Sequence, residues 1–201
     1  MSRPTDLSGR LWPIHLKPFD DELLSSWMIR LARAYDIKPV WFWRLFWPVD
    51  FRTVDIEAPG GLLDLLARRT ATSFERALET TLTAMAQEHS IARTLRYCVP
   101  CMAKGPQYFR RRWQLRSFLL CERHGVPLRT GCSEWGHELT PEAASPGEDS
   151  ILWCSRCRST VRIPGAEPFV PCRPVGQVLD WQSRLWNLLA NAGRMSHGDY
   201  A

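Results

Sequence analysis

The hydrophobic positions in the first half of the chain repeat with the period of amphipathic helices. After a proline-containing lead-in over residues 1–18, apolar side chains recur every three or four residues, which predicts a helix that ends near Ala34. Asp20 is its expected N-cap, and Phe19 and Leu24 have the spacing of a hydrophobic staple. This is the clearest helix signal in the sequence.

Further helices are predicted after this first one. Pro39 suits the first position of a second helix that reaches about Trp47, and the short turn before Pro39 predicts a helix-turn-helix. Leucines between Leu62 and Leu66 mark a third helix. A capping box at Thr72 to Glu75 opens a fourth, whose Phe74 should face the core.

The pattern changes near residue 93, where cysteines, glycines and short β-like runs such as Tyr108 to Leu115 replace helical periodicity. A last amphipathic helix is expected from about Val175 to Ala190. The sequence therefore predicts a mainly α protein with small β zinc ribbons. An N-terminal, helix-turn-helix-like helical domain would cover residues 1–92, and a C-terminal zinc-ribbon domain residues 93–201.

The composition places the chain among folded proteins without membrane spans. Of its 201 residues 45% are hydrophobic and 23% are charged, and no stretch approaches the roughly 18 apolar residues of a membrane helix. No apolar run near the N-terminus resembles a signal peptide, so a cytoplasmic location is expected. In a reducing cytosol, clustered cysteines favour metal binding over disulfides. The net charge of +5 permits nucleic-acid contact without requiring it.

Two cysteine knuckles have the spacing of a zinc site. Cys98 and Cys101 form a C-x-x-C pair, and after 19 residues Cys121 and His124 form a C-x-x-H pair. Each tight turn presents its ligands on one side, and a loop of this length can fold back to complete a tetrahedron. We expect one structural Zn²⁺ ion there, with buried, unliganded thiols as the alternative.

A second set of ligands is less complete. Cys132 is followed after 21 residues by the pair Cys154 and Cys157, but the position three after Cys132 is Trp135. His137 could complete a Cys₃His site for a second zinc ion. The alternative is a degenerate knuckle held together by tryptophan packing.

Two groups of side chains are candidates for contacts with partners. Trp41, Trp43 and Trp47 crowd the second helix, and they either form the N-terminal core or present a surface to a partner protein. In the zinc segment, basic residues alternate with aromatic rings, which suits nucleic acid or a protein partner. These basic residues, for which a merely solvated face is the alternative, are Arg110, Arg111, Arg112 and Arg116.

These motifs together resemble a known family. The segment LWPIHLKPFDDELLSSWMIRLARAY, with its D-E-L-L-S-S-W core at Asp21–Trp27, resembles the opening of the TniQ/TnsD family of transposon target-selection proteins. The region from Tyr97 to Leu139 is similar to the family's zinc segment, with Y-C-x-x-C, an aromatic-basic run ending in tryptophan, and C-x-x-H-G-V-P-L. One departure is Cys132-Ser-Glu-Trp135, where the family usually has C-x-x-C.

The resemblance implies an accessory factor in DNA transposition. Such a factor would bind a AAA+ ATPase regulator and link it to a target site, either on DNA or through an RNA-guided complex. We expect no enzyme activity, because no recognisable catalytic constellation is present in the sequence. The alternatives are a free-standing zinc-finger DNA-binding transcription regulator and a metalloenzyme, and the sequence leaves the assembly open, including a homodimer.

Overall fold

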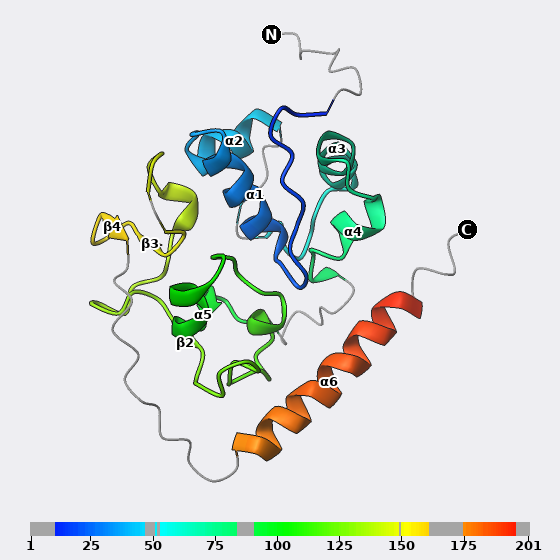
Figure 1. Ribbon diagram of the computed structural model, residues 1–201, viewed down its shortest axis with the longest axis vertical. Coiled ribbons are helices and arrows are strands. Elements are labelled where there is room, and N and C mark those ends of the chain that lie inside the picture. Colours follow the sequence, from blue (N-terminus) through cyan, green and yellow to red (C-terminus); the bar gives the residue numbers. More distant parts are fainter. Residues whose placement is uncertain are drawn as a thin grey trace.

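The computed structural model describes residues 11–46, 51, 53–83, 91–148, 150–160 and 175–195, and the described part is mainly helical with little strand (Figure 1). None of its helices is both long enough and apolar enough to cross a membrane. The elements are α1 (Leu24–Ala34), α2 (Pro39–Phe46), α3 (Gly60–Thr70), α4 (Phe74–Leu78), β1 (Arg96–Tyr97), α5 (Val99–Lys104), the 3₁₀ helix η3 (Arg112–Gln114), β2 (Arg129–Thr130), the 3₁₀ helix η4 (Pro141–Ala143), β3 (Trp153–Cys154), β4 (Ser159–Thr160) and α6 (Val175–Met195).

Helix α1 ends at Ala34 as predicted, but it begins later than the predicted N-cap at Asp20. Leu23 occupies the N-cap position and makes no side-chain cap, so the prediction for Asp20 is wrong. The chain turns sharply at Asp21, where φ is 61°, and Glu22 forms an isolated β-bridge with Arg110. The residues before Leu24 therefore pair with a distant segment, and this tertiary contact overrides the local capping signal.

The other N-terminal helices pack around α1. Helix α2 begins at Pro39 and α3 covers the predicted leucines. The capping residue of α4 is Ser73, whose Oγ accepts from the N–H of Arg76 at 3.1 Å. Helix α4 ends after five residues and leaves Phe74 42% exposed, so the prediction that this ring faces the core is wrong. Leu24, Trp27 and other α1 side chains form one buried cluster with α2 and α3.

Among the described residues of the cysteine-rich half, every strand is two residues long. β1 pairs with β2 and β3 with β4, both antiparallel. The strand predicted over Tyr108–Leu115 is instead a β-bridge at Arg110 followed by η3. The backbone of Phe109 and Arg111 bonds to Leu23 and Asp21, so this segment pairs with the N-terminal lead-in. The helix-turn-helix and zinc-ribbon arrangements stay predictions.

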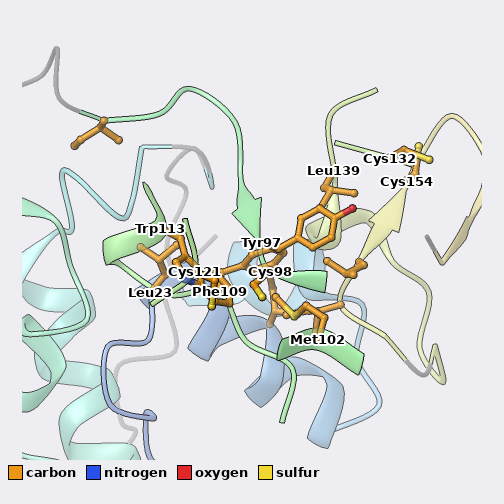
Figure 2. Packing of buried hydrophobic residues seen from close by; sticks show 14 of the residues in the cluster. Leu23, Tyr97, Cys98, Met102, Phe109, Trp113, Cys121, Cys132, Leu139 and Cys154 are labelled. Atoms are coloured by element: carbon orange, nitrogen blue, oxygen red, sulfur yellow. The ribbon is translucent and has the colours of Figure 1, made fainter. Parts of the chain in front are cut away.

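A second buried cluster draws on both halves of the chain (Figure 2). Leu23, Ile29 and Leu82 pack there with Tyr97, Trp113 and side chains of both cysteine groups. The domain boundary predicted at residue 92 stays a prediction, and the contacts across it are extensive and apolar.

Helix α6 lies along one side of the molecule (Figure 1). Its Gln182 is buried and bonds the backbone of Leu119 and Leu120, accepting from both N–H groups and donating to the Leu120 carbonyl. Trp186 meets Phe118 edge to face, with ring centroids 6.1 Å apart, and receives the guanidinium of Arg112 at 4.6 Å. These contacts attach α6 to the segment that precedes Cys121.

Candidate metal centres

The first group of predicted ligands converges at the junction of β1, α5 and a turn. Cys98 directly follows β1, and Cys101 lies in α5 one turn later. Cys121 and His124 flank a second turn, closed by a bond from the N–H of Gly125 to the Cys121 carbonyl at 2.8 Å. Each pair is thus presented by a tight turn, as the spacing predicts.

The distances within this group match a tetrahedral zinc site. Nδ1 of His124 lies 3.4 Å from Sγ of Cys98, 3.3 Å from Sγ of Cys101 and 3.7 Å from Sγ of Cys121. The sulfurs of Cys101 and Cys121 are 3.7 Å apart. Tetrahedral zinc with ordinary bond lengths places two sulfurs about 3.8 Å apart, and a sulfur and a nitrogen about 3.6 Å apart. The four atoms therefore surround a space of the right size for the ion, with Nδ1 as the imidazole donor.

The charges in this group also suit a cation. Hydrogen bonds from Cys101 and Cys98 lower the pKa of the Cys121 thiol. The hydrogen bond with Cys121 raises the pKa of Cys101 to about 11. Hydrogen bonds with Cys101 and Cys121 likewise raise the pKa of Cys98. One thiolate is thus stabilised at the expense of its neighbours. A divalent ion would remove this conflict because it favours ionisation of all three thiols.

The second group brings together three of its four predicted ligands. The ligand atoms of Cys132, Cys154 and Cys157 all lie within 4.8 Å of one another, with Cys132 and Cys157 sulfurs 3.5 Å apart. His137 is exposed and its ring is not in this group, although its carbonyl accepts from the Cys132 N–H at 2.6 Å. His137 as the fourth ligand stays a prediction.

A glycine makes the close turn of this second group feasible. Gly131 has a φ of 70°, and a Cβ there would lie 2.6 Å from the His137 carbonyl oxygen. Only glycine therefore fits without a backbone shift.

The predicted basic contact residues are largely engaged inside the protein. Arg112 donates from Nε to Asp21 at 2.6 Å, and Arg111 lies 3.7 Å from the same carboxylate. Arg110 is 7% exposed. Arg116 is exposed and donates from Nε to the Ile91 carbonyl at 2.9 Å.

The predicted tryptophan contacts divide between core and surface. Trp43 is 3% exposed and meets Phe51 edge to face, with ring centroids 5.5 Å apart. Trp41 is 57% exposed, and Leu45, one turn further along α2, is 70% exposed. Trp47 lies outside the described residues. The surface of α2 therefore presents Trp41 with Leu45.

Polar side chains of the D-E-L-L-S-S-W segment make buried contacts that were not predicted from the sequence. Glu22 accepts from Arg30 Nε at 2.8 Å and Nη2 at 2.6 Å, from the Phe19 N–H at 2.8 Å and from Ser26 Oγ at 3.0 Å. Ser26 Oγ also accepts from the N–H of Phe109 at 2.9 Å. The available signal was the presence of Glu22, Ser25 and Ser26 among apolar neighbours in the motif.

Asp55 caps α1 from a distant loop. Its two carboxylate oxygens accept from the Ser25 N–H at 2.8 Å and from Ser25 Oγ at 2.7 Å. Burial raises the pKa of Asp55 from 3.8 to about 6, against the opposing effect of the Ser25 bonds. The carboxylate is thus a tertiary replacement for the missing N-cap of α1.

The raised pKa of Asp55 predicts a defined pH dependence. The native state binds a proton more tightly than the unfolded chain, so this group makes stability fall between about pH 4 and pH 6 and level off above. In Asp55→Asn the amide oxygen can accept from the Ser25 N–H, and Nδ2 can donate to Ser25 Oγ in place of the second bond. The substitution should therefore stabilise the fold at pH 7.5 by about 3 kcal/mol, but not at pH 4. Urea unfolding of both proteins at the two pH values checks this. An equal effect of the substitution at both pH values would contradict it.

The fold and these centres define a class of mainly helical proteins with two cysteine-rich groups that could hold metal ions. A sequence model of the TniQ family matches residues 13–128, more than half of the chain, and the chain belongs to this family. Membership implies a transposition-related role in target selection. No curated protein matches the sequence significantly.

Proposed function

We propose that this protein is a non-catalytic, zinc-binding adaptor that links a AAA+ ATPase regulator of transposition to a target complex, on DNA or RNA-guided. The TniQ family match over residues 13–128 carries this proposal. Cys98, Cys101, Cys121 and His124 would hold one Zn²⁺ ion with four protein ligands. Such a site has no open position for substrate, so the ion would stabilise structure rather than catalyse hydrolysis.

A second ion is proposed at Cys132, Cys154 and Cys157. Three thiolates supply most of a zinc site, and the paired backbone of Cys132 and His137 keeps the imidazole on an adjacent turn. Rotation of the His137 side chain would complete the tetrahedron. Elemental analysis is expected to find two zinc ions per chain, and one in the His137→Ala variant. Two ions retained in that variant would exclude His137 as a ligand.

The surface of α2 is proposed to bind the ATPase regulator. Trp41 and Leu45 are one helical turn apart and strongly exposed, and Arg44 lies 5.6 Å from the Trp41 ring centroid. Tryptophan and arginine are enriched among the residues that dominate protein interfaces, and exposed apolar patches mark such interfaces. The neighbouring Trp43 anchors the helix in the core and would act only by holding this surface in place.

Double replacement of Trp41 and Leu45 by alanine tests this surface. Because each exposed side chain contributes little to folding, we expect zinc content and melting temperature to be nearly unchanged. Affinity for the purified regulator should fall at least about 30-fold, as for loss of an interface anchor worth about 2 kcal/mol. Calorimetry and a transposition assay in cells are the measurements.

Phe74→Ala is the matched control, because this ring is exposed at 42% on a different helix. It should leave both the affinity and transposition unchanged. If the double variant binds the regulator as wild type does, the α2 surface is not the binding site. If deletion of the whole protein leaves target selection unchanged, the adaptor role itself is wrong.

A further inference from the structure

A pocket of about 390 Å³ lies beside the first metal centre, and its walls contain three arginines and two aspartates. Three guanidinium groups line it, those of Arg110, Arg112 and Arg123, together with the ring of Tyr108. Cys101 contributes to the same wall, so the pocket adjoins the ligand cluster. Neither the metal centre nor the α2 surface accounts for this arrangement of charges.

Arg110 is the unusual member of the pocket. The residue is only 7% exposed, yet its guanidinium forms no hydrogen bond with any residue that the structure describes. Its closest carboxylate oxygen is that of Glu122 at 3.6 Å, and its remaining contacts are the rings of Tyr108 at 4.9 Å and Trp113 at 5.4 Å. The Arg110 side chain is 9% exposed, and a cation buried to this extent ordinarily has a hydrogen-bonded anion, so the pocket lacks a bonded acceptor.

The acids around the pocket do not supply that acceptor. Asp21 is engaged by Arg112 at 2.6 Å and by Arg111 at 3.7 Å. Asp20 bonds Arg76 at 2.5 Å. The Glu122 carboxylate lies 3.6 Å from Arg110 and 3.8 Å from Arg112, too far for a hydrogen bond to either, and its buried Oε2 has no hydrogen-bond partner among the described residues.

The other donors favour a ligand with several oxygens. Arg123 is exposed and forms no ion pair with another described residue. Its positive charge acts to lower the pKa of Tyr108, against the larger effect of burial, which raises it. The Tyr108 hydroxyl also has no hydrogen-bond partner among the described side chains. Two guanidinium groups and a phenol offer more donors than the two oxygens of a carboxylate can use, whereas a phosphate group can accept from all of them.

We propose that this pocket binds one phosphate group, held by Arg110 and Arg123 with the Tyr108 hydroxyl as a further donor. The phosphate enters past the exposed Arg123 and ends against the buried Arg110. Its source is either the backbone of a nucleic acid or free phosphate. The site does not depend on the ATPase regulator, so it can be tested separately from the adaptor function.

The test uses the full-length, zinc-loaded protein and two probes. Calorimetry measures binding of inorganic phosphate, and fluorescence anisotropy measures binding of a labelled DNA duplex between about 50 and 200 mM salt. Arg123→Ala should weaken phosphate binding at least about fivefold and lower the salt slope for the duplex by about 1. Arg129→Ala, an exposed arginine on β2 away from the pocket, should change phosphate binding less than about twofold.

A second variant addresses the buried arginine. Arg110→Gln should lose phosphate binding while its zinc content stays normal, which separates ligand binding from folding. Phosphate and duplex binding that both depend on Arg123 would support a nucleic-acid backbone as the source, and dependence of phosphate alone would support free phosphate. Failure to bind phosphate, equal losses in Arg123→Ala and Arg129→Ala, or Arg123-dependent binding of an acidic peptide instead would overturn the proposal.

Discussion

Cys121→Ser is expected to cost the protein one zinc ion and the folded structure of its cysteine-rich half. Cys121 is fully buried, and its sulfur lies 3.7 Å from both the Cys101 sulfur and His124 Nδ1, at the centre of the ligand group. The strands around it are two residues long and could not hold their arrangement alone. Structural zinc sites contribute on the order of 10 kcal/mol to folding, which is comparable to the total stability of a typical domain.

The measurements are zinc per chain by elemental analysis and hydrogen exchange of the backbone. Amides of residues 96–130 should lose protection in Cys121→Ser, and those in α3 should lose less, because α3 belongs to the other buried cluster. Lys104→Ala, exposed at the end of α5, should retain its zinc and its protection. A metal-free wild-type protein with a full set of protected amides would show that the ligand group holds no structural ion.

Glu22→Ala is expected to destabilise the fold by about 3–5 kcal/mol, the usual cost of removing one partner from a buried ion pair. The Glu22 side chain is fully buried, and that of Arg30 is 14% exposed. The substitution leaves the Arg30 charge without its carboxylate and the Phe19 N–H without its acceptor. Urea unfolding gives the free energy directly.

Glu79→Ala is the matched control, since Glu79 pairs with Arg76 at 2.9 Å on the surface, with 56% of its side chain exposed. This pair should contribute less than about 1 kcal/mol. The loss of stability in Glu22→Gln should lie between those of Glu22→Ala and Glu79→Ala, because the amide oxygen can accept some of the same hydrogen bonds without the charge. Equal losses for Glu22→Ala and Glu79→Ala would mean that the D-E-L-L-S-S-W motif has no special role in stability.

The sequence predicted the features that depend on local spacing. The proline before α2, the leucines of α3 and the amphipathic pattern of α6 located these helices, because each signal and its effect lie within a few residues. The knuckle spacing likewise predicted which four side chains would meet at the first centre, since two tight turns leave few ways to arrange the ligands.

Two of the failures share one cause, which is pairing between distant segments. Asp20 was the expected N-cap of α1, but α1 takes its cap from Asp55, 30 residues after Ser25. The basic run around Arg111 had the alternation of a free strand, but its backbone and side chains are bound to Asp21. Local sequence patterns predict neither contact, because the residues that flank each partner carry no signal for a distant pairing.

The same contacts change how the basic run can be tested. Replacing Arg111 and Arg112 together removes both cationic partners of Asp21, so loss of function in that variant would report damage to the fold. Arg123 is a better probe of nucleic-acid contact, with Arg129 as its control, because both are exposed and neither pairs with Asp21.

The second buried cluster, which draws on both halves of the chain, cannot be completed until most of the chain has been synthesised. Leu23, Ile29 and Leu82 leave the ribosome well before Trp113 and Cys121, which they need as neighbours. Part of the apolar surface of the first-half helices therefore stays exposed until the zinc knuckles have been translated. A nascent chain arrested before Cys121 should bind a chaperone, and one arrested after α6 has emerged should be released.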